Sequence, residues 1–323
     1  MELKFNEELK NIEGRKFKII DRKKDPRGSA FDLIKCQFLE EPFDDNGNKV
    51  EVVRMASQVC RGLIYNPYVR SVFGVGYSGY YEKDENYEAS IRDKWYSMLE
   101  RCKSDEHYKN ITIDSSWYNF SNFYDWVTSQ IGYKDYSLDK DFSQYYTKNK
   151  VYGPSTCIMI PQSLNVCIVD KEDSSKLPTG VAKVKSEKKV EVTIPIMDEN
   201  GCTRSIRLGR FLNTPNGLAE AFIHSKIARE LKLKTIAQIL YDNNYIDNRA
   251  YYFVSNYKYI SRYTDMDRVN IILRPNSYKE DVERFILTHN EFNTILDDMV
   301  EKIKSIPLNI LTPLHKENKD VIV

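Results

Sequence analysis

The chain has 323 residues, of which 41% are hydrophobic and 29% charged, a balance typical of globular proteins with two or three domains. No apolar run approaches the roughly 18 residues of a membrane-spanning helix, and the N-terminal stretch lacks the apolar core of a secretion signal. We therefore expect a cytoplasmic protein without membrane contact. The six cysteines form no C-x-x-C pair and the four histidines lie far apart, which argues against a zinc knuckle or a multi-histidine metal centre.

The first 65 residues carry a strand pattern. Extended apolar runs at 16–21 and 31–40 precede the turn sequence "DDNGNK" at 44–49, and another extended run follows that turn. This pattern predicts a small β-barrel-like domain, or a curled sheet, over residues 1–65.

Two aromatic-rich helices are predicted next. In "EASIRDKWYSMLERCKS" (88–104) apolar side chains recur at helical spacing. A second helix follows "ITID" (111–114), with Asn119 or Ser121 as its N-cap. Its apolar face is predicted to contain Phe120, Phe123, Trp126, Val127 and Ile131. We expect the three tryptophans to lie in the core rather than to stack on a ligand.

A separate α+β module is predicted over residues 174–234. Three strand patterns, "GVAKVKS", "KKVEVTIPI" and "TRSIRLGRFL", precede a helix that Thr214 caps and Pro215 begins. The window from Lys176 to Thr235 contains twelve Lys and Arg against six Asp and Glu, although the whole chain has a net charge of only +1. Such a local excess is typical of a phosphate-binding face, and a solvated surface of mixed charge is the alternative.

The C-terminal part is predicted to be helical. Short helices are expected around 235–244 and 248–256, and a longer amphipathic helix over 277–304. The predicted fold class is therefore α+β and multidomain. It combines the β-barrel-like domain, a domain with the aromatic-rich helices, a three-stranded sheet with one helix, and a helical C-terminus.

Short motifs in a fixed order resemble phage-encoded proteins of the HNH homing-endonuclease type that carry an APETALA/ERF-like DNA-binding module. The motifs are "NPYVRSVFGVGYSG" (66–79), "KWYSMLERC" (94–102), "SSWYNFSNFYDW" (115–126), "LDKD" (138–141), "NKVYGPSTCIMIPQSLN" (149–165), "LPTGV" (177–181), "LGRFLNTP" (208–215) and "NYKYI" (256–260). The resemblance implies an HNH-like ββα nuclease domain at 66–173 and an APETALA/ERF-like DNA-binding domain at 174–234. The helical C-terminal extension, residues 235–323, is predicted from the apolar periodicity described above. Residues 261–323 lie outside the match.

The resemblance also implies a site. Asp139 falls on the metal-binding carboxylate of the HNH pattern and Asn165 on its metal-binding asparagine, so Mg²⁺ or another divalent cation is the implied cofactor. Lys140 stands where the general-base histidine is expected, and Thr156 falls near the asparagine that orients this histidine.

The replacement of histidine by lysine bears on catalysis. Lysine has a reference pKa of about 10.4, and neighbouring Asp139 and Asp141 favour its charged form, so Lys140 is a poor base. Lys140 is then expected to stabilise the phosphate, while the metal or Asp141 activates the water. Losing a general base typically costs about 10²–10⁴-fold in rate.

The implied partner is double-stranded DNA, contacted by cations of the three-stranded sheet. These are Lys183, Lys185, Lys188, Arg204, Arg207 and Arg210, whose outward direction is inferred from strand alternation. The expected activity is metal-dependent nicking or cutting of DNA, in the host cytoplasm if the chain is phage-encoded.

Several alternatives stay open. Asp139 and Asp141 could cap a turn, and Asn165 the segment after it, without any metal. The chain would then be a DNA-binding protein without catalysis, whose C-terminal helix recruits a protein partner, or a phage structural or host-takeover protein that reuses the scaffold.

Overall fold

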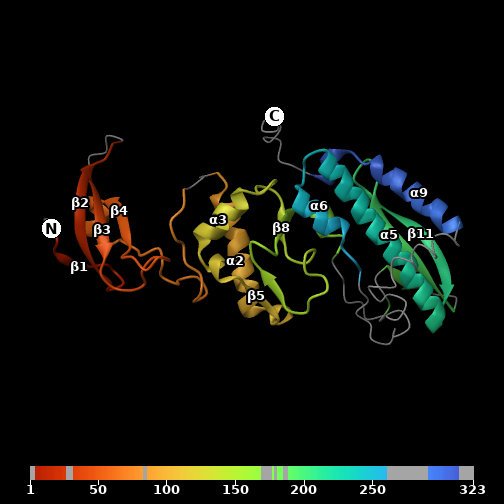
Figure 1. The fold of residues 1–323 in the computed structure, drawn as a ribbon, viewed down its shortest axis with the longest axis horizontal. Coiled ribbons are helices and arrows are strands. Elements are labelled where there is room, and N and C mark those ends of the chain that lie inside the picture. The colour runs from red at the N-terminus through yellow and green to blue at the C-terminus, as the bar shows by residue number, and fades with distance from the viewer. Residues whose placement is uncertain are drawn as a thin grey trace. The chain divides into compact units, whose positions relative to one another are not determined.

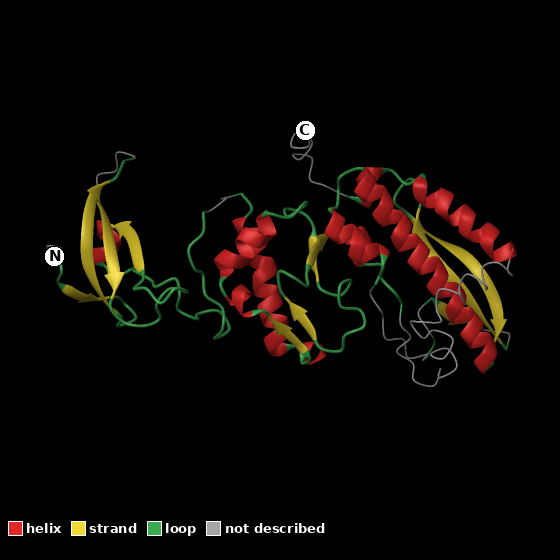
Figure 2. Cartoon of the chain, in the orientation of Figure 1, coloured by secondary structure: helices red, strands yellow, loops and turns green. Residues whose placement is uncertain are grey.

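The computed structural model describes residues 4–26, 32–82, 86–168, 177, 180–184, 188–259 and 290–312. The chain divides into two compact units, Met1–Val127 and Thr128–Val323. The fold is mixed α+β, with several small separate sheets and helices in both units, as Figures 1 and 2 show. This confirms the predicted fold class at its coarse level.

The first unit begins with a four-stranded antiparallel sheet. Its strands are β1 (Glu8–Lys10), β2 (Lys16–Lys24), β3 (Asp32–Phe38) and β4 (Glu51–Met55), in the order β1-β2-β3-β4. Alternate residues face a core that the short helix α1 (Ala56–Cys60) also covers. In the described residues β1 and β4 do not pair with each other, so the predicted barrel-like domain is an open sheet.

The two aromatic-rich helices of the first unit are confirmed. The helices are α2 (Glu88–Ser104) and α3 (Phe120–Thr128), separated by η1 (Glu106–Tyr108), β5 (Ile111–Ile113) and η2 (Ser115–Tyr118). Trp95 and Trp117 are fully buried, and the Trp95 indole donates a 2.7 Å hydrogen bond to the carbonyl of Trp117. The prediction for Ile131 is wrong, because α3 ends before it and its side chain is exposed.

The second unit contains a three-stranded antiparallel sheet with a long helix along it. The strands are β9 (Val181–Lys183), β10 (Lys189–Met197) and β11 (Thr203–Leu212), with β10 in the middle. Helix α5 (Pro215–Asp242) packs on β10 and β11, and the Thr214 hydroxyl caps its first turn (Figure 1). The strand and helix predictions for this module are confirmed.

Helix α5 is longer than predicted. The separate helix expected at 235–244 does not exist, because α5 continues without a break to Asp242. No Gly or Pro follows Gly217 within the helix, and Ile236 and Leu240 extend its buried face.

Further helices complete the second unit. Helix α6 (Asn248–Ser255) is confirmed, and the Asp247 carboxylate caps it. Helix α9 (Asn290–Lys304) packs on α5 and β11 with its apolar side, and the short α10 (Leu308–Leu311) follows. The predicted stretch 277–289 lies outside the described residues. None of the described helices is long and apolar enough to cross a membrane.

Candidate functional site

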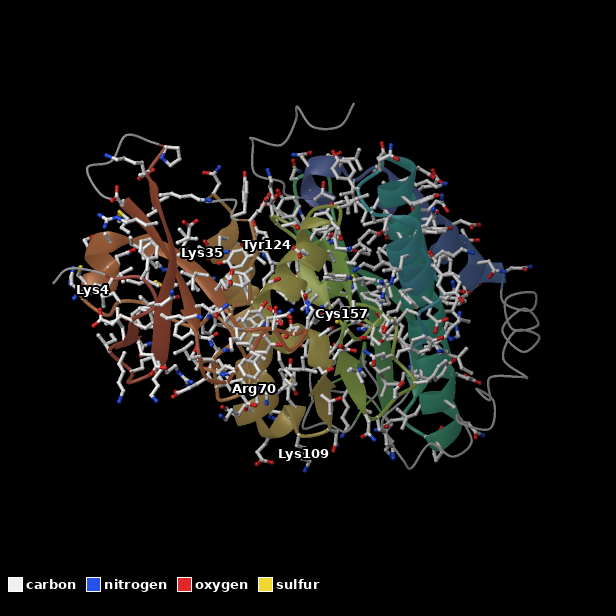
Figure 3. All side chains as sticks on the ribbon, turned by 60° about the vertical axis from the view of Figure 1, so that its left-hand side comes forward. Lys4, Lys35, Arg70, Lys109, Tyr124 and Cys157 are labelled. Carbon is white, nitrogen blue, oxygen red and sulfur yellow. The ribbon has the colours of Figure 1, made fainter. Side chains whose placement is uncertain are left out.

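The segment around Asp139 forms two paired strands followed by a short helix. Strand β6 (Ser137–Asp139) pairs antiparallel with β8 (Ile158–Ile160), and β7 (Lys150–Tyr152) lies between them in sequence. All three residues of β8 are buried, and Pro161 then begins α4 (Gln162–Asn165). We call residues 137–165 the hairpin segment. Cys157, which precedes β8, lies in the interior, and burial raises the pKa of its thiol to about 12 (Figure 3).

Asp139 lies at the end of β6 and is almost completely buried. Its Oδ1 accepts hydrogen bonds from the backbone amides of Asp141, at 2.8 Å, and Phe142, at 2.9 Å. Its Oδ2 accepts no hydrogen bond from the described residues. Burial, followed by the negative charge of Asp141, raises the pKa of Asp139 to about 6, against the smaller effect of the two amides and Lys140. The carboxyl group therefore caps a turn and keeps one oxygen available.

Lys140 is a buried ion-pair partner. Its ammonium group lies 3.0 Å from Asp141 Oδ2 and 5.2 Å from the centre of the Tyr152 ring. Asp141 also binds Lys150 through its other oxygen. Burial alone would raise the pKa of Asp141, but the charges of Lys140 and Lys150 outweigh it and the pKa is lowered. A carboxylate held ionised between two ammonium groups is a weak proton acceptor, so the geometry disfavours Asp141 as a general base.

Asn165 and Thr156 complete the set implied by the HNH resemblance. Asn165 is the last residue of α4, half-buried, and its side chain makes no hydrogen bond within the part of the chain that the structure describes. Helix α4 is joined to β6 at the other end of the strand pair, where Ser137 bonds Gln162 at 2.8 Å. The Thr156 hydroxyl is directed to the carbonyls of Val151 and Gly153 and not to Lys140.

The residues therefore fit a divalent cation only in part. Asp139 offers one oxygen and Asn165 another, and Mg²⁺ commonly completes such a set with water and phosphate oxygens. No hydrogen bond or shared partner links Asp139 to Asn165 among the described residues. Nor do three or more His, Cys, Asp or Glu side chains gather in a metal-binding group anywhere in the described ranges.

Two partners in this segment were not singled out from the sequence. Lys150, which binds Asp141, lies inside the motif at 149–165. Asp141 and Lys150 are nine residues apart, so their ion pair depends on how the intervening loop folds. The Gln144 side chain donates to the carbonyls of Lys140 and Val151, both at 2.9 Å, and accepts from the Val151 amide. Gln144 thereby holds the loop between β6 and β7 closed. A glutamine at a loop position carries no pattern that would have revealed this role.

The second candidate surface is the face of the β9–β11 sheet opposite the buried strand residues. Arg207 and Arg210 both lie on it, and both bond the Glu191 carboxylate, at 2.8 Å and 2.7 Å. Strict alternation would place these two arginines on opposite faces because they are three residues apart. A β-bulge between Val192 and Thr193 shifts the register, so that Arg207 faces Thr193 and Arg210 faces Glu191.

The other predicted cations lie elsewhere. Arg204 faces buried Ile196 across the strands and bonds Asp198 in the β10–β11 turn at 3.0 Å. Lys183 is the strand partner of buried Val190, so it lies on the side of the sheet that packs on the helix. It is the last residue of β9, and its side chain is exposed. Lys188 is exposed and precedes β10. Lys185 lies outside the described residues.

Comparison of the chain with protein-family models, with curated proteins and with solved structures finds no match.

Proposed function

We propose that this protein binds double-stranded DNA through the face of the β9–β11 sheet that carries Arg207 and Arg210. The observation that carries the proposal is that one carboxylate, Glu191, holds both guanidinium groups on a solvent-exposed strand surface. Two arginines fixed in this way lose little side-chain entropy on binding phosphates or base edges. The positive charge of residues 176–235 adds a sequence-independent attraction to the phosphate backbone.

Metal-dependent hydrolysis of phosphodiester bonds is a second candidate function. It is favoured by Asp139, a buried carboxyl group with one oxygen fixed by two amides and the other available. With a pKa of about 6, Asp139 is mostly ionised at neutral pH and can bind a cation or accept a proton. Asn165 would supply the second oxygen to Mg²⁺, which would activate the attacking water. Lys140 would stabilise charge rather than accept a proton.

A DNA-binding protein without catalysis is the competing candidate. It is favoured by the Lys140–Asp141–Lys150 ion pairs and by the turn that Asp139 caps, because each charged group of this turn has a structural partner. The apolar side of α9 packs on α5 and β11 within the second unit. Within the described residues this helix therefore has no second apolar face with which to recruit another protein, as was predicted for it.

DNA binding is tested by fluorescence anisotropy with a duplex of mixed sequence at several salt concentrations. The proposal expects the logarithm of the binding constant to fall linearly with the logarithm of salt concentration, since bound phosphates release counterions. Affinity that does not change with salt would contradict it. Hydrolysis is tested by incubating supercoiled plasmid with excess protein and Mg²⁺. Nicking that disappears in Asp139→Ala supports catalysis, whereas no nicking by the wild type supports the binding protein.

A further inference from the structure

The short segment after α6 contributes no residue to the set that either candidate site uses. It consists of Tyr257, Lys258 and Tyr259, which belong to the "NYKYI" motif at 256–260. We call these three residues the strap. The backbone amides of Asn256 and Tyr257 still bond the last turn of α6, and the chain then leaves the helix. The contacts of the strap indicate its role.

Its first residue packs on the hairpin segment. The Tyr257 ring lies 5.1 Å from the Phe142 ring and 5.2 Å from the Tyr145 ring, both in tilted or edge-on orientations. Phe142 is fully buried, and its backbone amide donates to Asp139 Oδ1. Tyr257 therefore supports the turn in which the Asp139 carboxyl group is fixed.

Its other residues bind helix α5 through one buried ion pair. Glu230 accepts hydrogen bonds from the Tyr259 amide, at 3.0 Å, and from the Lys258 ammonium, at 3.1 Å. Lys226, which is 4% exposed, binds both the Glu230 carboxylate and the Tyr259 carbonyl. The backbone of Tyr259 is thus held at both its amide and its carbonyl by side chains from one face of α5.

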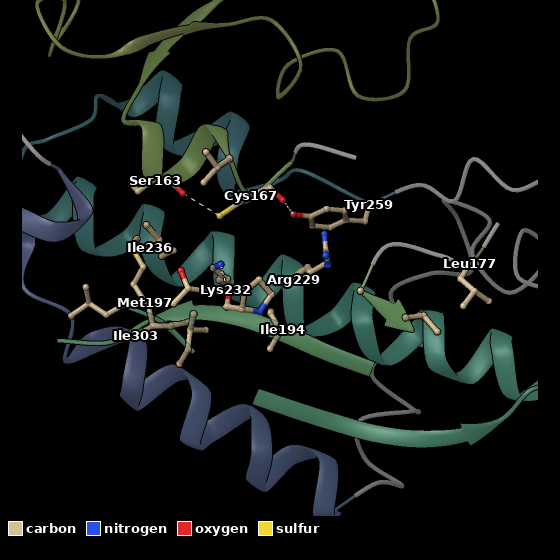
Figure 4. A pocket seen from close by; sticks show the side chains of 17 residues that line it. Ser163, Cys167, Leu177, Ile194, Met197, Arg229, Lys232, Ile236, Tyr259 and Ile303 are labelled. Carbon is tan, nitrogen blue, oxygen red and sulfur yellow. Dashed lines mark hydrogen bonds between the residues drawn. The ribbon is translucent and has the colours of Figure 1, made fainter. Parts of the chain in front are cut away.

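The Tyr259 side chain makes a third connection. Its hydroxyl donates a 2.6 Å hydrogen bond to the carbonyl of Cys167, two residues after α4 ends, and the Arg229 guanidinium lies 5.3 Å from its ring centre (Figure 4). Burial raises the pKa of this phenol well above its usual range, so it stays a donor. A cavity of about 730 Å³ lies beside Tyr259 and is lined by residues of α4, β10, α5 and α9.

We propose that the strap is a positioning element that fixes the hairpin segment relative to the sheet carrying Arg207 and Arg210. It contacts the hairpin segment just after Asp139 and the chain just after Asn165, and it binds the helix on which the sheet packs. The function of this positioning rests on the proposed DNA binding. If the sheet binds a duplex, a fixed hairpin segment meets the duplex at a constant distance from the base pairs that the sheet contacts.

The decisive variant is the double substitution Lys226→Met with Glu230→Leu. It replaces a buried ion pair by apolar side chains of similar size, a change that is often neutral for stability, while it removes the groups that hold Tyr259. The matched control is Lys302→Met with Asp298→Leu on α9, another i,i+4 ion pair, which is exposed and does not contact the strap.

The measurement is the distance distribution between two spin labels in the free protein. One label is placed at Tyr146→Cys in the loop of the hairpin segment and the other at Cys202 in the β10–β11 turn, since both positions are exposed. Exposed Cys60 and half-buried Cys102 and Cys167 are replaced by Ser, so that only two reactive thiols remain. We expect one narrow distance peak for the parent and the control, and a broad distribution in its place for the strap variant, with unchanged DNA affinity. Hydroxyl-radical footprinting should show a shorter protected region for the strap variant.

A narrow peak that persists in the strap variant overturns the inference. If the double variant does not fold, Tyr257→Ala is judged by the same criterion, because it removes the ring from Phe142 and Tyr145 and leaves the buried ion pair intact. A wild type that binds no DNA would remove the proposed function. The distance measurement would still decide whether the strap fixes the hairpin segment.

Discussion

Two clusters in the second unit have the same charge pattern and different surroundings. In each, one carboxylate lies between two cations: Asp141 between Lys140 and Lys150, and Glu191 between Arg207 and Arg210. In the hairpin segment the lysine side chains are 7% and 19% exposed, whereas the sheet arginines are 61% and 41% exposed. We call them the buried triad and the exposed triad.

Burial decides what each triad can do. In the buried triad the carboxylate neutralises cations that are withdrawn from water, so removing it would leave buried Lys140 without the counter-charge of Asp141. In the exposed triad the cations are solvated and the carboxylate mainly orients them, so they remain available to another anion. Exposure, which sets how far water solvates and screens the charges, therefore distinguishes a structural clamp from a binding surface.

The largest effect is expected when the carboxylate of the buried triad is neutralised. Asp141→Asn should destabilise the second unit by about 2–4 kcal/mol, because Lys140 loses its counter-charge in a buried position. Glu191→Gln should cost no more than about 1 kcal/mol, since its partners are solvated. Urea unfolding followed by far-UV circular dichroism and by hydrogen exchange of residues 128–168 measures the difference.

The tryptophans follow the first unit only, because all three lie in it. Hydrogen exchange of residues 128–168 is therefore the probe that isolates the second unit. Equal destabilisation by Asp141→Asn and Glu191→Gln would break the comparison between the two triads.

A pH-dependent effect of similar size is expected from Asp139, which adjoins the buried triad. Its pKa rises from 3.8 in the unfolded chain to about 6 in the fold, so its contribution to stability is complete below about pH 4 and is lost as pH rises through 6. Asp139→Asn removes this pH dependence and keeps an oxygen for the two amides. Relative to the wild type, the variant should therefore gain up to about 3 kcal/mol between about pH 4 and pH 7.

The measurement is the difference between the two unfolding free energies at each pH, in EDTA so that no divalent cation interferes. The lowered pKa of Asp141 has the opposite sign and is common to both proteins, so the subtraction largely removes it. A difference that stays constant over this pH range would mean that Asp139 is not desolvated.

Much of the fold follows from patterns along the chain. The helices 88–104 and 248–255, the sheet at 181–212 and the cap at Thr214 depend on spacing and end residues that lie close in sequence. The open edge of the first sheet could not be predicted in this way. Whether the sheet closes into a barrel depends on whether β1 pairs with β4, and these strands are far apart in sequence. The full length of α5 was not predicted. The apolar periodicity of its second half is the same whether that half continues α5 or forms a new helix, and only its packing in the fold decides between the two.

The sites were less predictable than the fold. That Asp139 caps a turn was one of the alternatives open from the sequence, but the burial of Lys140 and its partnership with Asp141 and Lys150 depend on folding of the whole loop. On the sheet, a single bulge brings Arg207 and Arg210 to one face, against the alternation used for the prediction. One extra residue in a strand therefore determines which cations can meet a ligand together.

The smallest effects are expected on DNA affinity, where the two triads can be compared directly. Arg207→Ala or Arg210→Ala should weaken binding to a duplex by about 1–3 kcal/mol and lower the salt dependence by about one released counterion for each phosphate that the variant no longer binds. Lys150→Met removes the same charge from the buried triad and should leave affinity and salt dependence unchanged, because the Lys150 side chain is only 19% exposed. Anisotropy titrations at several salt concentrations measure both quantities. If Lys150→Met weakened binding as much as Arg210→Ala, the hairpin segment would itself be part of the DNA-binding surface, and exposure in the free protein would no longer separate the two triads.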